Sequence, residues 1–447
     1  MKKLTVNSVR ALLIGATIVA GAFASASVQT PVERKLYVGA GSHEATLEFD
    51  GKVELFAQNP PDEARSLSHI QRQVEHLFGP MGERHGNPVL AVPKTDHKIT
   101  NIQIAKIGSH SYRISYRYSG TIVVEDGVET YKVALPTNPQ SIFKLGLVGE
   151  DNPCTDHHYQ SEGDFWYFWS PSRPGCQLKE GKDYQTFVGT LKAKKNSART
   201  YPEYERMVSN GVIRMSLLMG MDDPGKEADP NKSSDINASN FRQIKETLLS
   251  EGYASSGKWT PAQVAKIVTE DYDVKPYVET FTKKVDGPHG KITLSVRIFF
   301  GPSGIDEDSE PFHYFLRDSL KNDAVMAYAG HSGLGGHLSL KGIEANTEID
   351  LTPDASKYQI YYFNSCSSYP YYGDQYFARK GGTKNLDIIT NGLATYFHVM
   401  PDTNLTIIRA IESWASGKGR LSYQALAASL DTSNLLGING DEDNPKK

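Results

Sequence analysis

Cysteine is scarce in this chain of 447 residues, which contains only three. So small a number excludes a disulfide-rich scaffold, in which cross-links replace much of the hydrophobic core. Charge of one sign is not in excess either, since the formal net charge is -4. No basic run interleaved with aromatic residues occurs, so the composition argues against a nucleic-acid-binding protein.

Long apolar runs are also missing, apart from a short one near the N-terminus. Lys2, Lys3 and Arg10 precede apolar residues 11–24, and small residues end this run. The pattern predicts a bacterial secretory signal peptide over residues 1–26. The run is short for a transmembrane helix, and no later stretch approaches the ~20 apolar residues that a span requires. We therefore expect a periplasmic or secreted protein with no membrane span.

The length of the chain exceeds one ordinary core and predicts two domains. Residues 30–200 show an α+β pattern, with hairpins expected around Asp50-Gly51 and Asp126-Gly127 and a helix over 62–78. Residues 205–440 alternate strand and helix, which is typical of an α/β domain: a mostly parallel sheet with helices on both faces.

Cys154 and Cys176 border a segment whose prolines and glycine suit a closed loop. An exported protein permits a disulfide between them. The alternative is a metal site in which Cys154 joins His157, His158 and nearby carboxylates. Because this spacing matches no standard zinc finger, we favour the disulfide and assign no metal.

Cys366 and His331 each follow a short apolar run, 358–365 and 324–330 respectively. Such runs, bounded by glycine and small polar residues, predict buried strands of a parallel sheet, whose C-terminal ends hold ligand sites. A thiol beside an imidazole is the minimal apparatus for nucleophilic catalysis. We expect Cys366 to be the nucleophile and His331 its general base or acid.

Backbone groups around these two residues are suited to a developing oxyanion. The candidate donors are the N–H of Cys366 and that of Ser332 or Gly333, where glycine permits close approach of a substrate. An imidazolium at His331 would lower the pKa of the thiol and favour the reactive thiolate.

Three other interpretations of this region remain. Ser332 could be the nucleophile of a serine hydrolase, although Leu334 stands where the Gly-x-Ser-x-Gly elbow requires glycine. His331 and His337 could bind a metal, although their spacing is not that of a helical zinc site. The chain could also be an exported binding protein with a degenerate catalytic domain.

The two motifs resemble those of the clan CD cysteine peptidases, which include caspases, legumain, clostripain and gingipains. The shared features are an apolar strand that ends in His331 with glycines and an apolar strand that ends in a small residue and Cys366. The order of elements over 205–435 is similar to the caspase-like fold, and strand 386–390 with Asn391-Gly392 resembles the gingipain-like branch. The resemblance implies an endopeptidase that cleaves protein or peptide substrates with a Cys366–His331 dyad.

Residues 30–200 carry no comparable set of catalytic side chains. We expect this region to be an inhibitory prodomain or a binding module. The polar stretches 192–199 and 222–234 are the expected cleavage sites. Acidic loops at 306–310 and 439–444 could hold structural calcium, but neither fits the EF-hand pattern and solvated loops are the favoured interpretation.

Overall fold

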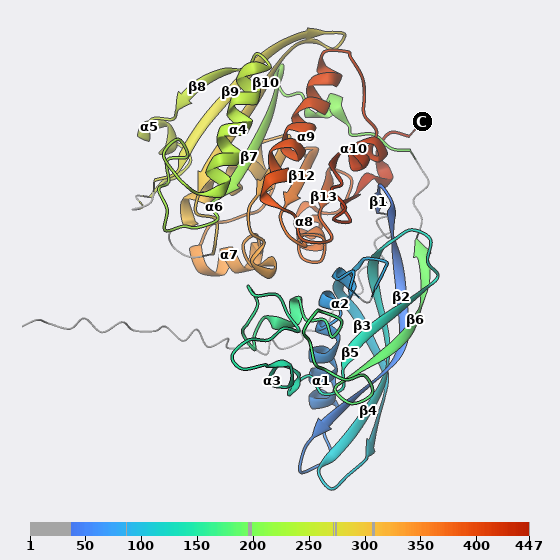
Figure 1. Ribbon diagram of the computed structural model, residues 1–447. Helices are drawn as coiled ribbons and strands as arrows, with labels where there is room; N and C mark the ends of the chain where they lie inside the picture. Colours follow the sequence, from blue (N-terminus) through green and yellow to red (C-terminus); the bar gives the residue numbers. More distant parts are fainter. Residues whose placement is uncertain are drawn as a thin grey trace, which may run out of the picture. The chain divides into compact units, whose positions relative to one another are not determined.

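The computed structural model describes residues 37–85, 87–194, 199–270, 272, 275–305 and 309–446. The expected signal peptide lies outside these described residues. The chain forms two sheets, with strand orders β3-β4-β2-β6-β5 and β1-β14-β13-β12-β11-β7-β10-β9-β8 (Figure 1). The expected mixed α/β class is thus confirmed. No helix in the described part of the chain is long and apolar enough to cross a membrane.

The elements have the following bounds. The first sheet consists of β2 (Ser42–Phe56), β3 (Ala91–Lys106), β4 (Ser111–Glu125), β5 (Thr130–Pro136) and β6 (Tyr184–Lys194). The second consists of β1 (Val38–Gly39), β7 (Val212–Gly220), β8 (Ala254–Lys258), β9 (Tyr277–Gly287), β10 (Gly290–Gly301), β11 (Val325–Ala329), β12 (Gln359–Asn364), β13 (Leu386–Thr390) and β14 (Gly437–Asn439). The α-helices are α1 (Glu63–Glu75), α2 (Phe78–Gly82), α3 (Ile142–Gly146), α4 (Ile236–Ser250), α5 (Pro261–Val264), α6 (Glu310–Asn322), α7 (Leu340–Thr347), α8 (Gly373–Lys380), α9 (Met400–Ala415) and α10 (Tyr423–Leu430).

The hairpin predicted around Asp50-Gly51 is wrong, because these residues lie within a continuous strand of the first sheet. β2 runs straight through Asp50-Gly51 and pairs with β4 along its whole length. A Cβ atom on Gly51 would lie 2.4 Å from the Cζ atom of Tyr116. Glycine is therefore needed here to make room for a cross-strand aromatic ring rather than to form a turn.

The hairpin predicted around Asp126-Gly127 is also wrong. β4 pairs with β2 and β3, whereas β5 pairs with β6. The N–H of Asp126 donates to the Gly41 carbonyl oxygen, and its carboxylate lies 2.6 Å from Nδ1 of His43. These contacts hold the turn against the start of β2, so the chain leaves β4 without pairing back on it.

The second sheet has a parallel centre and antiparallel edges. The central strands β13, β12, β11, β7 and β10 are parallel neighbours. β8 and β9 continue the sheet beyond β10, and β14 and β1 continue it beyond β13, all in antiparallel pairs. The prediction of a mostly parallel sheet therefore holds for the centre alone. The predicted alternation of strands and helices did not include β9, which joins β10 by a tight turn from Gly287 to Gly290.

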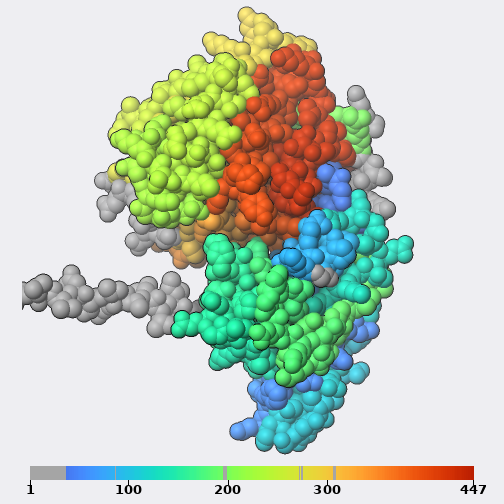
Figure 2. All heavy atoms as spheres, viewed as in Figure 1, coloured from blue at the N-terminus to red at the C-terminus, as the bar shows by residue number. Residues whose placement is uncertain are grey.

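Helices cover both faces of this sheet, as expected. α4, α9 and α10 bury one face through side chains such as Phe241, Ile408 and Leu426. α6, α7 and α8 bury the other through Phe315, Ile343 and others. In Figure 1, α4 and α9 cross the sheet side by side, and in Figure 2 the corresponding yellow-green and red surfaces meet. The central strands are thus buried on both faces, and their ends are the part of the sheet left for a site.

The segment that precedes β2 belongs to the second sheet. Val38 and Gly39 pair with Ile438 and Gly437 of β14. The hydroxyl of Tyr37 donates to the Leu435 carbonyl oxygen at 2.7 Å. The described part of the chain therefore starts in the second sheet, forms the first sheet, and then returns to the second.

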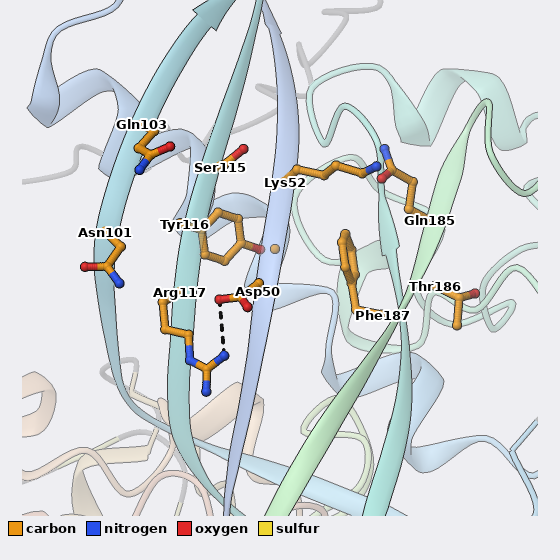
Figure 3. Close-up of a pocket in the computed structure, with 11 residues that line it drawn as sticks. Asp50, Lys52, Asn101, Gln103, Ser115, Tyr116, Arg117, Gln185, Thr186 and Phe187 are labelled. Atoms are coloured by element: carbon orange, nitrogen blue, oxygen red, sulfur yellow. Dashed lines mark ion pairs between the residues drawn. The ribbon is translucent and has the colours of Figure 1, made fainter.

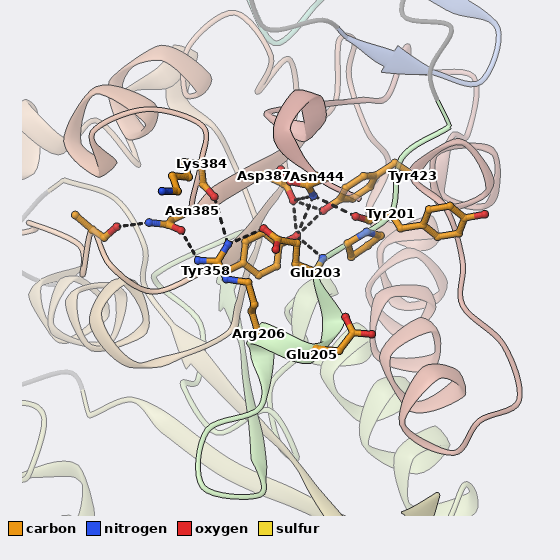
Figure 4. Close-up of polar contacts among 12 residues, drawn as sticks. Tyr201, Glu203, Glu205, Arg206, Tyr358, Lys384, Asn385, Asp387, Tyr423 and Asn444 are labelled. Atoms are coloured by element: carbon orange, nitrogen blue, oxygen red, sulfur yellow. Dashed lines mark hydrogen bonds and ion pairs between the residues drawn. The ribbon is translucent and has the colours of Figure 1, made fainter. Parts of the chain in front are cut away.

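A buried polar cluster fastens the C-terminal segment to the second sheet (Figure 4). Asp387 in β13 accepts hydrogen bonds from the hydroxyls of Tyr358 and Tyr423 and from Nδ2 of Asn444. Burial raises the pKa of the Asp387 carboxyl well above its ordinary range, while these hydrogen bonds act to lower it. The cluster thus orders a segment that contributes β14.

Candidate active site

His331 and Cys366 lie at the same edge of the second sheet. In the parallel pair β11–β12, Ala329 is in register with Asn364. His331 stands 331 − 329 = 2 residues beyond its strand partner, and Cys366 stands 366 − 364 = 2 residues beyond its own. The two side chains therefore emerge at equivalent positions on neighbouring strands, where open α/β sheets place their sites.

Cys366 sits on a tight turn. The next residue, Ser367, has φ 43°, a left-handed conformation that residues other than glycine rarely adopt. Its N–H donates to the Leu393 carbonyl oxygen, and the Ser368 hydroxyl donates to the Phe363 carbonyl oxygen at 2.7 Å. Such strain persists where surrounding contacts fix the backbone, a situation common at functional sites.

The thiol of Cys366 is partly buried. Within the described part of the chain, its hydrogen-bond partner is the Thr395 carbonyl oxygen, with Sγ–O 3.6 Å. Burial raises the pKa of the Cys366 thiol above its ordinary value. The lowering of the thiol pKa that was expected from an imidazolium at His331 is not found in this conformation.

A carboxylate that the sequence did not reveal orients His331. Nε2 of His331 lies 2.9 Å from Oδ1 of Asp222, and the Phe397 ring meets the imidazole edge-on at 5.3 Å between centroids. Asp222 follows β7, the neighbour of β11, just as His331 follows β11. Asp222 could have been predicted from its position directly after the buried strand β7. It was instead assigned to the polar stretch 222–234.

The oxyanion candidates lie in a turn that follows His331. Gly333 has φ 54°, and a Cβ atom there would lie 2.3 Å from Cδ2 of His337. Among the described residues, no other residue accepts a hydrogen bond from the N–H of Ser332, Gly333 or Cys366. The Ser332 carbonyl oxygen, in contrast, accepts from the Tyr372 hydroxyl at 3.0 Å. The N–H groups of this edge are thus available to an anionic oxygen.

The loop closed by Cys154 and Cys176 lies close to Cys366. The predicted disulfide is confirmed. Burial raises the pKa of Tyr159 to about 12, and the nearby Cys366 thiol adds to the increase. Burial likewise raises the pKa of Tyr167 well above its ordinary value, with a smaller effect from Cys366. Both tyrosines therefore lie within electrostatic range of the thiol.

Further contacts hold residues 369–371, which follow Cys366, against the first sheet and its helices. The Tyr369 hydroxyl donates to the Glu44 carboxylate at 2.6 Å. Thr95 donates to the Pro370 carbonyl oxygen at 3.3 Å. The rings of Phe78 and Tyr371 stack with an angle of 2° between their planes. These contacts fix the segment that follows Cys366.

The geometry does not support the two alternative sites, a Ser332 nucleophile and a metal site at His331 and His337. Ser332 is 5% exposed, and the next α-helix, α7, begins 340 − 332 = 8 residues later, too far for a nucleophile elbow. The imidazole centroids of His331 and His337 are 6.5 Å apart, and the two belong to no candidate metal group in the described ranges.

The acidic loops give no clear calcium site. Residues 306–308 of the first loop lie outside the described residues. In the second, Asp441 accepts from the Thr200 hydroxyl at 2.5 Å, and Asn444 belongs to the Asp387 cluster. The side chains of Asp441 and Asn444 are thus engaged in hydrogen bonds within the protein.

A separate cleft of about 550 Å³ lies in the first sheet, where β2 and β6 diverge (Figure 3). Their pairing ends at Glu48 and Thr190. Amide, charged and aromatic side chains line the opening, and Arg117 pairs with Asp50 at 3.2 Å. Such a lining suits a polar ligand.

No protein-family model matches this sequence, and no curated protein matches it. The resemblance of the His331 and Cys366 motifs to cysteine peptidases of the caspase and gingipain kind therefore stays a prediction.

Proposed function

We propose that this chain is an exported cysteine endopeptidase with a caspase-like catalytic domain. Cys366 is the nucleophile, and His331 is the general base and acid. The observation that carries the proposal is the placement of Asp222, His331 and Cys366 just beyond the ends of three adjacent parallel strands, β7, β11 and β12. The contact of 2.9 Å between Asp222 and His331 supports it, because a base in nucleophilic catalysis is usually oriented by a third group.

The chemistry follows from these positions. His331 takes the proton of the Cys366 thiol, and the sulfur attacks the carbonyl carbon of the scissile peptide bond. The N–H groups of Cys366 and Gly333 or Ser332 stabilise the oxyanion. His331 then protonates the leaving amine, which leaves a thioester. Water hydrolyses the thioester and regenerates the thiol.

The conformation described here corresponds to a latent form of this enzyme. Sγ of Cys366 is directed to the Thr395 carbonyl oxygen, and burial raises the pKa of the thiol. Catalysis requires the thiol to leave the Thr395 carbonyl oxygen and to transfer its proton to His331. In this proposal, the region that forms the first sheet and the disulfide-closed loop, residues 42–194, is an inhibitory prodomain.

The test is hydrolysis of casein by the signal-free protein, measured before and after limited digestion with trypsin. Wild type should cleave casein after digestion, while Cys366→Ala and His331→Ala should lose the activity and keep the wild-type circular dichroism spectrum. His110→Ala, a change at an exposed histidine of the first sheet region, is the matched control. Activity retained by a folded Cys366→Ala protein contradicts the proposal, and its loss in Ser332→Ala alone indicates a serine hydrolase.

The second candidate function is a binding protein with an inactive catalytic domain. The polar cleft bordered by Asp50, Arg117 and Phe187 favours it, since this cleft is independent of Cys366. A wild-type protein that never cleaves casein and whose Cys366 resists alkylation until unfolding would favour this function.

A further inference from the structure

A cluster of metal-binding side chains lies in the disulfide-closed loop, outside the catalytic edge. Nδ1 of His158 is 2.8 Å and Nδ1 of His157 is 3.4 Å from Oδ1 of Asp156. One ligand atom from each of the three residues lies within 4.8 Å of the others. No other group of three such residues meets this criterion in the described ranges.

The geometry differs from the metal site considered in the sequence. Cys154 is oxidised in the disulfide and cannot be a ligand. Its place is taken by Asp156, adjacent to the two histidines. The imidazole rings lie 3.7 Å apart between centroids. Nδ1 of each ring is within 3.4 Å of the same oxygen of Asp156, Oδ1.

The chemistry of these ligands selects the ion. Two imidazoles and a carboxylate bind zinc with bonds of about 2.0–2.2 Å and leave a fourth position for water. Calcium and magnesium prefer oxygen ligands, so they fit poorly. The histidine side chains are 79% and 71% exposed, which lets an ion reach them from solvent.

The two carboxylate oxygens of Asp156 have different partners, and Oδ1 also accepts a hydrogen bond from the N–H of His158 at 3.0 Å. The Arg173 guanidinium lies 3.6 Å from Oδ2 of Asp156, on the opposite oxygen from the histidines. Arg173 also pairs with Glu83 at 2.8 Å, which disperses part of its positive charge. Oδ1 therefore remains directed at the imidazoles.

We propose that Asp156, His157 and His158 bind one divalent transition-metal ion of the zinc type. The site directly precedes Tyr159, whose ring packs on that of Tyr167 with 5.5 Å between centroids. The ring of Phe78 contacts both Tyr167 and Tyr371, which links the loop to the segment that follows Cys366. A bound ion at this site fixes the loop and, through these rings, the segment next to Cys366. This consequence rests on the proposed function, whereas metal binding itself does not.

The test is zinc chloride titration of the untagged, signal-free protein by isothermal calorimetry in a non-chelating buffer. One equivalent should bind, and His157→Ala or His158→Ala should weaken binding by more than about tenfold, since loss of even an outer-shell partner costs about 10- to 100-fold in metal affinity. His110→Ala is the matched control and should bind like wild type. Cys366→Ala should also bind one equivalent, which excludes the catalytic thiol as the ligand.

The proposal is overturned if zinc does not bind, or if the double variant His157→Ala/His158→Ala, folded by circular dichroism, binds it like wild type. Alkylation of Cys366 by iodoacetamide, with and without zinc, tests the consequence for the thiol. Slower alkylation in wild type but not in the double variant supports it. An unchanged rate with intact zinc binding removes the link to Cys366 and leaves the metal site standing.

Discussion

The imidazole of His331 is hydrogen-bonded to the carboxylate of Asp222, with 2.9 Å between Nε2 and Oδ1. In the proposed reaction, the nitrogen that remains, Nδ1, exchanges the proton with Cys366. An ionised carboxylate at this position fixes the orientation of the ring and stabilises the imidazolium that forms during catalysis. Asp222 is therefore a positioning residue in the proposed reaction.

Replacement of Asp222 should impair turnover more than substrate binding. We expect Asp222→Asn to lower kcat by about 100- to 1000-fold, within the range that general acid–base catalysis contributes, with little change in KM. Asp223→Asn, next to it but in contact with Gly225 rather than with His331, is the matched control. Equal losses in both variants, or a loss in KM alone, would argue that Asp222 has only a structural role.

The disulfide should stabilise the fold and protect the thiol. Loss of the link across a separation of 22 residues should reduce the free energy of unfolding by about 3 kcal/mol on the chain-entropy model. Urea denaturation of Cys154→Ser/Cys176→Ser against wild type measures this. The same variant should alkylate faster at Cys366, and an unchanged rate would show that the loop does not shield the thiol.

Tyr159 should contribute directly to this shielding. Tyr159→Ala removes a large side chain near the thiol and should accelerate alkylation of Cys366 severalfold in the native state. Phe56→Ala, a change at an exposed aromatic residue at the end of β2, is the control. The idea fails if both variants react at the wild-type rate.

The buried Asp387 should make stability depend on pH. Because its pKa is raised in the folded protein, the native state binds more protons than the unfolded state between the ordinary carboxyl pKa and the folded value. Its contribution to stability is therefore full at low pH and declines as the pH rises through that window. Asp387→Asn should lack this decline, so its melting temperature should gain on that of wild type from pH 4 toward neutrality. A constant difference would contradict the prediction.

The sequence predicted the centre of the second sheet well, because its strands are continuous apolar runs that burial on both faces demands. The positions of His331 and Cys366 followed from the same rule. Asp222 was not predicted, since a contact between residues 331 − 222 = 109 positions apart depends on strand order, and strand order leaves no local pattern.

The first sheet was harder to predict for a different reason. Asp50-Gly51 has the composition of a turn, yet the ring of Tyr116 occupies the space above Gly51 in a continuous strand. Tertiary packing decides between these two uses of glycine, and the local sequence is the same for both.

Because β1 pairs with β14, a single cut in the chain between the two sheets would not release the severed fragment. After cleavage within 192–199, Val38 and Gly39 would still be held on Ile438 and Gly437, a few residues from the start of β2. The severed fragment would remain at a high effective concentration, roughly millimolar for so short a tether, and would rebind faster than it diffuses away. Dilution would not activate such an enzyme, so release calls for a second cut between Gly39 and Ser42 or for a competitor that displaces the edge strand.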